Sequence, residues 1–145
     1  MDHLQLDQQL CFPVYALSRH MMALYRPFLL RLNLTYPQYL VMMVLWEHRE
    51  VSVKELGGLL WLDSGTLTPL LKRMEEHGQL TRSRSSADER VVRVRLTEKG
   101  LALKEQVLEV PEKFRAQLAT DDAQLLQLRD QLKQLLSISS QKCYA

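Results

Sequence analysis

Apolar residues near the start of the chain recur at the spacing of an amphipathic helix. The repeated positions lie three or four residues apart, at Leu17, Met21, Leu24 and Phe28. This pattern predicts a helix from about Pro13 to Leu32, because a proline fits the first helical turn, where its missing N–H would have no partner. A proline also disfavours helical angles at the preceding residue, here Phe12, so Cys11 is expected at or just before the helix start.

The next part of the chain has the pattern of one buried helix followed by two short capped helices. The segment LTYPQYLVMMVLWEHREV is apolar on nearly every side and predicts a buried helix that starts near its proline. SVKE forms a capping box, in which Ser52 caps a short helix and Glu55 reaches back to it. A second short helix is capped by Asp63 or Ser64 and ended by Gly78. Two short helices joined by a tight turn predict a helix-turn-helix.

Beyond that glycine the apolar period changes from that of a helix to that of a strand. LTRSRS and RVVRVRL alternate, and the second segment places Val92, Val94 and Leu96 on one face. Arg93 and Arg95 fall on the opposite face, and SSADE between the two segments is a polar tip. A β-hairpin directly behind a helix-turn-helix predicts a winged helix.

The last part of the chain returns to a helical pattern. Thr97 caps one helix, which is broken or bent near Pro111, and a final helix runs from Asp121 to about Ser139. The final helix carries a leucine stripe at Leu125, Leu128, Leu132 and Leu135. Such stripes are often ordinary core, but the winged helix already has a core, so the first and last helices indicate a homodimer.

These elements predict one domain over residues 1–145. The expected fold is mainly α with a small β-hairpin wing, a winged helix-turn-helix whose dimer is formed by the N- and C-terminal helices. Residues 1–34 and 101–145 would supply the dimerisation helices, and residues 35–100 would be the DNA-binding core.

Composition narrows the class of protein. Of 145 residues, 46% are hydrophobic and 25% are charged, as in folded domains, and no apolar run approaches the roughly 20 residues of a membrane span. The N-terminus MDHLQLDQQL carries acids where a signal peptide carries basic residues, so we expect a cytoplasmic protein with free thiols. CxxC and HExxH are absent and the four histidines are scattered, which predicts no metal and no cofactor.

Excess basic charge is confined to the middle of the chain. Residues 63–104 hold nine basic and six acidic side chains, whereas the flanking segments are neutral or slightly acidic. A local basic patch is typical of a nucleic-acid binder, and a winged helix places its second short helix in the major groove and its wing in the minor groove. The candidate contacts to double-stranded operator DNA are Ser64, Thr66, Thr68, Lys72 and Arg73 on the helix, and Arg82, Arg84 and Arg90 on or near the wing.

Arg90 is the candidate for insertion into the minor groove. Arginine suits this role because its planar guanidinium carries a fork of donors, and Asp88 is placed to hold that guanidinium. The alternative is that the wing arginines form only a solvated hairpin face.

The order of helices followed by DERVVRVRLTEKG (88–100) resembles the multiple-antibiotic-resistance regulator (MarR) family of dimeric winged-helix repressors. Within that family, LCFPVY, LNLTYPQYL, LWEH and LDSGTLTPLLKRME are closely similar to the organic hydroperoxide resistance regulators (OhrR-type). The resemblance implies a repressor of a palindromic operator that senses organic hydroperoxides through Cys11. It also implies that Tyr25 and Tyr36 hydrogen-bond the cysteine, with Tyr36 donated by the other subunit, and that Tyr15 is a further aromatic of the pocket.

The chemistry of a thiol sensor agrees with this placement. A thiolate is the nucleophile that attacks a peroxide, and both a helix start and tyrosine hydroxyls favour the charged form. Oxidation would convert Cys11 to a sulfenic acid, which can condense with a small thiol or with Cys143 in the tail. The added bulk would shift the dimer helices and change the spacing of the two recognition helices, so that DNA is released.

Two other functions stay open on the sequence. The first is a repressor of the same fold that releases DNA on binding a small phenolic or hydrophobic ligand, with Cys11 incidental. The second is a thiol peroxidase that uses Cys11, although an enzyme has no use for a wing and a helix-turn-helix. We therefore expect a regulator and not an enzyme.

Overall fold

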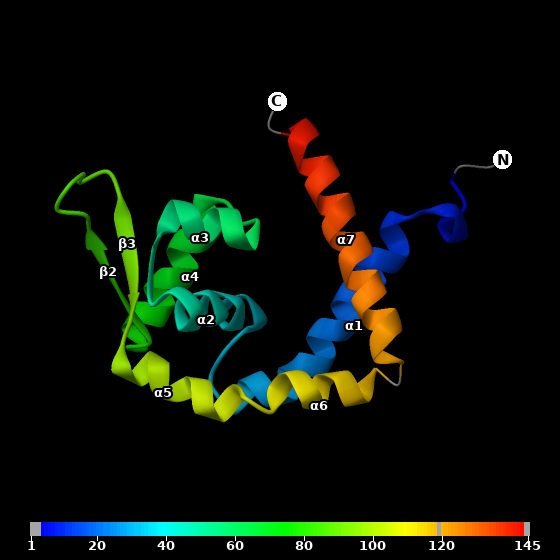
Figure 1. The fold of residues 1–145 in the computed structure, drawn as a ribbon, viewed down its shortest axis with the longest axis horizontal. Coiled ribbons are helices and arrows are strands. Elements are labelled where there is room, and N and C mark those ends of the chain that lie inside the picture. Colours follow the sequence, from blue (N-terminus) through cyan, green and yellow to red (C-terminus); the bar gives the residue numbers. More distant parts are fainter. Residues whose placement is uncertain (1–3, 119, 144–145) are drawn as a thin grey trace. The chain divides into compact units, whose positions relative to one another are not determined.

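The computed structural model describes residues 4–118 and 120–143, with side chains as far as Ser139. The chain divides into two compact units, Met1–Pro111 and Glu112–Ala145, and each is described by itself. The first contains the 3-10 helix η1 (Leu6–Gln8), α1 (Cys11–Leu30), α2 (Tyr36–His48), β1 (Glu50–Ser52), α3 (Val53–Leu60), α4 (Ser64–Glu76), β2 (Leu80–Arg84), β3 (Val92–Leu96) and α5 (Glu98–Val107) (Figure 1). Helix α6 (Val110–Gln117) begins at the end of this unit, and α7 (Asp122–Cys143) lies in the second.

The fold confirms the mainly helical winged helix-turn-helix. Helices α3 and α4 form the helix-turn-helix, and the β2–β3 hairpin follows as the wing. The capping box is present, since the Ser52 N–H donates to Glu55 Oε2 at 2.7 Å and the Glu55 N–H to Ser52 Oγ at 3.1 Å. Asp63 rather than Ser64 caps α4, because its Oδ1 accepts the Thr66 N–H at 2.7 Å.

Helix α1 begins earlier than the sequence pattern predicts. Its first residue is Cys11, so Phe12 has helical geometry and the expectation that Pro13 would keep it outside the helix is wrong. Pro13 is the third helical residue, where an absent N–H costs no intrahelical hydrogen bond. The helix therefore starts at the cysteine itself.

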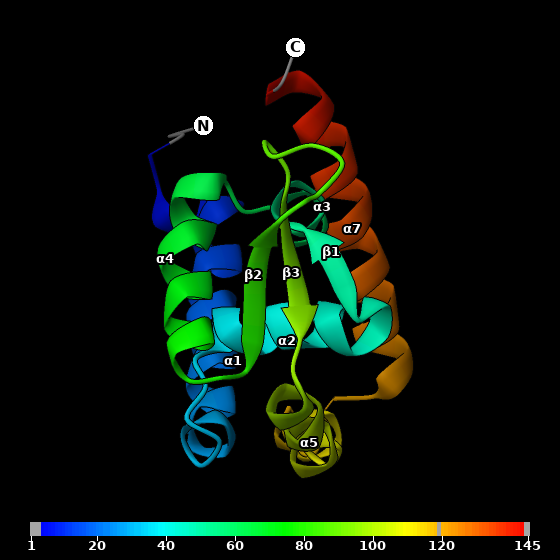
Figure 2. The ribbon, with the colours of Figure 1, turned by 90° about the vertical axis from the view of Figure 1, so that its left-hand side faces the viewer.

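The sheet has a third strand that the sequence pattern does not reveal. β3 pairs antiparallel with both β1 and β2 in the order β1-β3-β2 (Figure 2). β1 is only three residues long, too short for alternation to be visible. Its Glu50 accepts hydrogen bonds from Arg93 Nε at 2.6 Å and Arg95 Nε at 2.5 Å, and these bonds lower the pKa of the carboxyl group. The two outward arginines of β3 thus hold β1 to the sheet.

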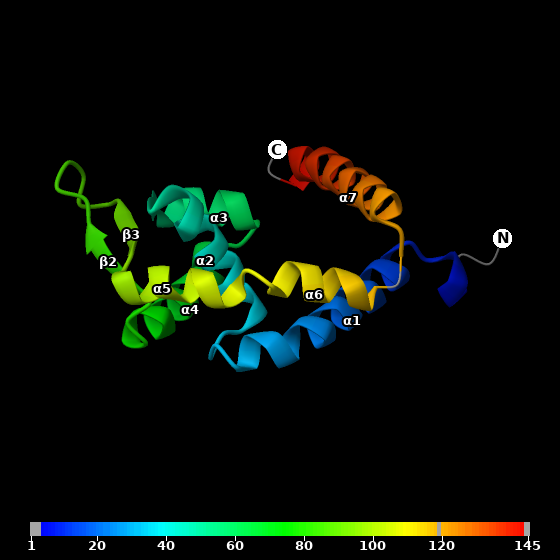
Figure 3. The same ribbon diagram turned by 60° about the horizontal axis from the view of Figure 1, so that its bottom comes forward.

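The core of the first unit is built around α2. Val41, Met42 and Leu45 on this helix are completely buried, which agrees with its apolar composition on all sides. α2 packs against α1, α3, α4 and α5, and Figure 3 shows α2 to α5 gathered beside the β2–β3 hairpin. A helix so placed contacts both the long N-terminal helix and the helix-turn-helix.

The second unit consists of the rest of α6 and the long helix α7. Arg115 and Asp122 form an ion pair across the turn between these helices, with Nη1 of Arg115 lying 3.7 Å from Oδ1 of Asp122. α7 starts at Asp122, one residue after the expected start, and continues beyond Ser139 to Cys143. Its exposed apolar residues are Leu126, Leu128, Leu132, Leu135, Leu136 and Ile138.

Candidate functional site

The N-terminal turns of α4 present a row of hydroxyl groups. Ser64, Thr66 and Thr68 are all exposed, while Leu67 and Leu71 on the opposite face are buried and fix the helix in the unit. Thr68 Oγ1 donates to the Ser64 carbonyl at 2.7 Å, so this hydroxyl is left to act as an acceptor toward any ligand. The exposed Lys72 and Arg73 add positive charge one to two turns later.

The wing tip holds Arg90 in a fixed direction. Its side chain is 91% exposed, yet Nε lies 3.1 Å from Asp88 Oδ1 and Nη2 lies 3.1 Å from Asp88 Oδ2. The hydrogen bonds from Arg90 lower the pKa of Asp88, and the same contact raises the pKa of Arg90. Arg84 donates to the Glu89 carbonyl at 3.3 Å, close to the same tip. The expected contact between Asp88 and Arg90 is therefore present.

Arg82 has a different environment from the other candidate DNA contacts. Its Nε and Nη2 donate to Glu75 Oε2 at 3.0 and 2.8 Å, and its backbone N–H donates to Glu75 Oε1 at 2.7 Å. The guanidinium is thus directed at α4 instead of standing free on the wing. The contact of Glu75 with Arg82 was not predicted from the sequence. The one signal for it was the position of an acidic residue in the last turn of α4, shortly before an arginine of the hairpin.

Cys11 lies at the exposed first position of α1. Tyr15 follows one turn later on the same face, and the Arg19 guanidinium lies 5.5 Å from the centre of its ring, a cation–π contact. Phe12 and Val14 beside the cysteine are also exposed large apolar residues. This end of α1 therefore combines a thiol with an uncovered apolar and aromatic surface.

Tyr25 and Tyr36 form a cluster of their own at the other end of α1. Their ring centres are 5.0 Å apart, and Tyr39 lies 6.0 and 6.2 Å from them. Burial raises the pKa of Tyr36 and of Tyr39, which keeps both phenols protonated as hydrogen-bond donors.

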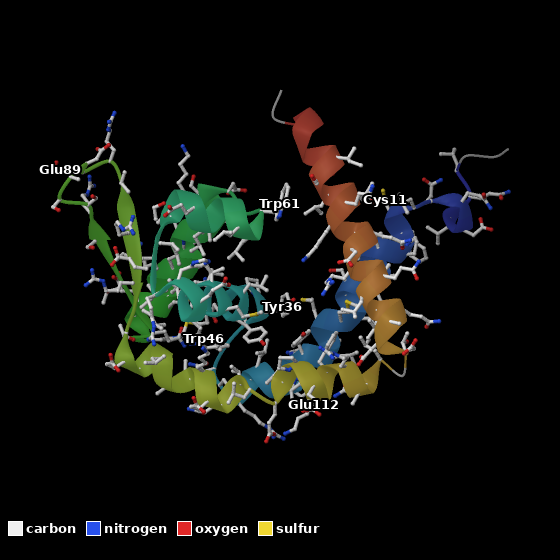
Figure 4. The ribbon with its side chains drawn as sticks, viewed as in Figure 1. Cys11, Tyr36, Trp46, Trp61, Glu89 and Glu112 are labelled. Atoms are coloured by element: carbon white, nitrogen blue, oxygen red, sulfur yellow. The ribbon has the colours of Figure 1, made fainter. Side chains whose placement is uncertain are left out.

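The structure does not bring this cluster to Cys11 within one chain. Tyr25 follows Cys11 by fourteen residues on the same helix, a rise of about 21 Å, farther than a tyrosine side chain reaches. Figure 4 shows Cys11 and Tyr36 well apart. The resemblance implies that Tyr36 comes from the other subunit. The length of α1 separates Tyr25 from the Cys11 of its own chain in the same way, so the two side chains of one chain cannot form a hydrogen bond.

The remaining candidates concern Cys143, metals and membranes. Cys143 ends α7, but its side chain lies outside the described residues. Within the described part of the chain, no group of three or more His, Cys, Asp or Glu side chains could hold a metal ion. Among the helices of that same part, none is long and apolar enough to cross a membrane.

Comparisons with known proteins agree on one family. The family model for the transcriptional regulator SarA/Rot matches residues 23–107. An organic hydroperoxide resistance transcriptional regulator of Bacillus subtilis (strain 168) is 49% identical over 141 residues, which cover 97% of this chain and 96% of that protein.

Solved structures share the fold over nearly the whole chain. Reduced AbfR bound to DNA matches with a TM-score of 0.78 at 33% identity, covering 94% of this chain and 95% of that one. Disulfide-formed AbfR matches with a TM-score of 0.67 at 34% identity, covering 93% and 95%; AbfR comes from Staphylococcus epidermidis. These relatives are transcriptional regulators and not enzymes. The chain described here therefore belongs, with the organic hydroperoxide resistance regulators, to the MarR/SarA-type winged-helix transcriptional regulators.

Proposed function

We propose that this protein is a DNA-binding repressor that organic hydroperoxides inactivate by oxidising Cys11. The observation that carries the proposal is the 49% identity with an organic hydroperoxide resistance regulator. That match leaves about four residues of the chain uncovered, so it includes Cys11, which the structure places exposed at the start of α1.

The proposed reaction is a nucleophilic displacement at oxygen. The Cys11 thiolate attacks one oxygen of the peroxide, the O–O bond breaks, and the alkoxide leaves and takes up a proton as the alcohol. The sulfur is oxidised to a sulfenic acid while the peroxide is reduced. A small thiol then condenses with the sulfenic acid, forming a disulfide and releasing water, with Cys143 as the alternative partner. The structure of disulfide-formed AbfR supports this course, because a related protein also forms a disulfide.

The tyrosine donors in this proposal come from a second copy of the chain. Tyr25 and Tyr36 lie together but about 21 Å along α1 from the cysteine of their own protomer. A twofold dimer that pairs the N-terminal helices in opposite directions brings the cluster of one protomer to the cysteine of the other. Protonated phenols then donate to the thiolate and stabilise its charge. Tyr15, one turn from Cys11, lines the same pocket.

Exposed apolar residues support a homodimer through the two terminal regions. Leu6, Leu10 and Phe12 are uncovered around the start of α1, and α7 exposes a row of leucines. Burying these surfaces against a second copy removes apolar area from water. Residues 1–34 and 101–145 thus serve dimerisation, and residues 35–100 serve DNA binding.

The dimer would place two α4 helices on a palindromic operator. Half-sites about 34 Å apart match one turn of DNA, with each wing at the adjacent minor groove. Ser64, Thr66 and Thr68 would contact base edges or phosphates, Lys72, Arg73 and Arg84 would contact phosphates, and Arg90 would enter the minor groove. Arg82 holds the wing to α4 instead of touching DNA.

The test is fluorescence anisotropy on a palindrome taken from upstream of the protein's own gene. Organic hydroperoxide is titrated into complexes of wild type and of Cys11→Ser, with a physiological small thiol present. The expected result is release by wild type and retention by Cys11→Ser. Equal release by both proteins would contradict the redox proposal and favour a regulator released by a small ligand.

A further inference from the structure

A row of aromatic rings connects the tyrosine cluster to the far end of α2. Tyr36, Tyr39 and Trp46 lie along this helix, and the Tyr39 and Trp46 rings meet edge to face with centres 6.2 Å apart. Tyr25 of α1 joins the row at its start, 5.0 Å from Tyr36. Tyr39 and Trp46 are buried, so neither ring moves without moving its neighbours.

The row ends on a hydrogen bond to another helix. Trp46 Nε1 donates to the Gly100 carbonyl at 2.9 Å, a buried contact between residues 54 positions apart. Gly100 is the third residue of α5, and Thr97 caps this helix by accepting the Gly100 N–H at 3.0 Å. The indole thus fixes the first turn of α5 from the side of α2.

This turn of α5 touches the junction between the recognition helix and the wing. Gly100 packs so closely on the Gln79 carbonyl that a Cβ on the glycine would clash with it. Thr97 also donates to the Gln79 carbonyl oxygen, from its hydroxyl at 2.9 Å and from its backbone N–H at 3.3 Å. Lys99 Nζ donates to the nearby His77 carbonyl at 2.6 Å. Gln79 is the residue that precedes β2, so any shift of Gly100 reaches the connection of α4 with the wing.

We propose that Trp46 is a positioning residue that couples the tyrosine cluster to the α4–wing junction. The inference rests on the proposed function, since it supposes that oxidation of Cys11 in one subunit disturbs Tyr25 and Tyr36 of the other. A displacement of Tyr36 is passed by ring contact to Tyr39 and Trp46, and by the indole hydrogen bond to Gly100. The DNA-reading elements then change position without any change in their own side chains.

The indole N–H separates this role from simple core filling. Phenylalanine keeps a ring against Tyr39 but has no N–H to donate to Gly100. The Gly100 carbonyl keeps its acceptor role inside α5, where the residue four positions later donates to it, so the loss leaves no orphaned group. Trp46→Phe therefore removes the connection and leaves most of the packing.

The experiment compares Trp46→Phe with Trp61→Phe. Trp61 directly follows α3, is 54% exposed and stands outside the aromatic row, so it controls for the loss of a tryptophan. Operator affinity of each dimer is measured by anisotropy before and after oxidation with an organic hydroperoxide and a small thiol. We expect wild type and Trp61→Phe to lose about a hundredfold in affinity on oxidation, and Trp46→Phe about tenfold or less. Reduced Trp46→Phe should bind within about threefold of wild type, so that the substitution weakens the response to oxidation and not DNA binding itself, whereas a purely structural role would lower affinity in both states.

A second measurement applies even if Trp46→Phe folds poorly. Trp46 is the sole tryptophan in Trp61→Phe, so its emission reports the end of the aromatic row. Emission should change when that protein is oxidised, and it should stay constant in Trp61→Phe/Cys11→Ser.

The outcomes separate this inference from the function beneath it. Wild type that keeps DNA on oxidation overturns the proposed function and this inference with it. Wild type and Trp46→Phe that release DNA equally overturn only the role of Trp46. Emission in Trp61→Phe that is unchanged by oxidation overturns that role as well.

Discussion

Arg82 of the wing and Glu75 of the recognition helix form a salt bridge, with Nη2 and Oε2 2.8 Å apart. The carboxylate also accepts the backbone N–H of Arg82, so one side chain of α4 holds both the backbone and the guanidinium of β2. The side chains are 26% and 34% exposed, which limits screening by solvent. Recognition helix and wing strand are thereby joined in one rigid element.

Glu75→Gln should lower the free energy of unfolding by about 1 kcal/mol at neutral pH, because a partly covered charged pair with several hydrogen bonds is lost. Arg82 lowers the pKa of Glu75 below its usual value. The contribution is therefore fully present above the unfolded-state carboxyl pKa of about 4.3 and disappears as the pH falls through the lowered folded value. Urea unfolding of wild type and Glu75→Gln at several pH values measures this difference in the free energy of unfolding.

The neighbouring exposed Glu76 provides the matched control for Glu75. Glu76→Gln should change the free energy of unfolding by less than about 0.5 kcal/mol at any pH. An equal loss for the two variants, or a loss at Glu75 that persists in acid, would contradict the role of the salt bridge.

Arg90→Ala should weaken operator binding and reduce its salt dependence. The guanidinium is exposed and directed by Asp88, so its removal takes one positive charge from the DNA interface. We expect about a tenfold loss of affinity and a fall of about 1 in the slope of log K against log salt concentration. Anisotropy titrations between low and physiological salt give both values.

Arg129→Ala in α7 removes the same charge from outside the winged helix. Arg129→Ala should leave the slope of log K against log salt concentration unchanged. If the two arginine variants have the same slope, the wing tip does not contact DNA and its charges only solvate the hairpin.

Local signals accounted for the element order of this protein. Capping residues such as Ser52 and Asp63, and the change of period after Gly78, act within a few residues, so they predicted the helix-turn-helix and the wing. The start of α1 was misjudged because Pro13 is the third helical residue, where its missing N–H costs no intrahelical hydrogen bond, so the helix can begin two residues before the proline. β1 was missed because three residues show no period.

Contacts between different helices and strands are hard to recognise from local sequence patterns. Glu75 and Arg82 each look like solvated surface charges in the sequence, and only the fold shows that they meet. Trp46 and Gly100 lie 54 positions apart. The resemblance named Cys11 and the tyrosines, but only the length of α1 shows that they cannot meet in one chain.

Gly100→Ala should destabilise the protein by about 2–3 kcal/mol, because a methyl group there overlaps the Gln79 carbonyl and approaches Leu96 Cδ1. Gly58 in α3 is the matched control, since a Cβ at that position meets nothing within 4 Å. Gly58→Ala should stabilise by about 0.5–1 kcal/mol through helix propensity. Thermal denaturation distinguishes these opposite signs, and a tolerated Gly100→Ala would show that α5 can move away from the wing junction.

Mixed dimers test whether Tyr25 and Tyr36 act on the cysteine of the partner subunit. One dimer pairs a Cys11→Ser chain with a Tyr25→Phe/Tyr36→Phe chain, so its sole Cys11 is opposite intact tyrosines. The matched dimer carries all three substitutions on one chain and none on the other, so its sole Cys11 is opposite phenylalanines. Both contain the same residues in total and differ only in their distribution.

The first mixed dimer should be oxidised at the wild-type rate, and the second about ten- to a hundredfold more slowly. A hydrogen bond to a charged group contributes about 1.5–3 kcal/mol, and each 1.4 kcal/mol changes a rate about tenfold. Stopped-flow loss of the Cys11 thiol under excess organic hydroperoxide measures both rates. The opposite order would place the tyrosines in the same chain as the cysteine, which the rise of about 21 Å along α1 forbids unless the helix breaks.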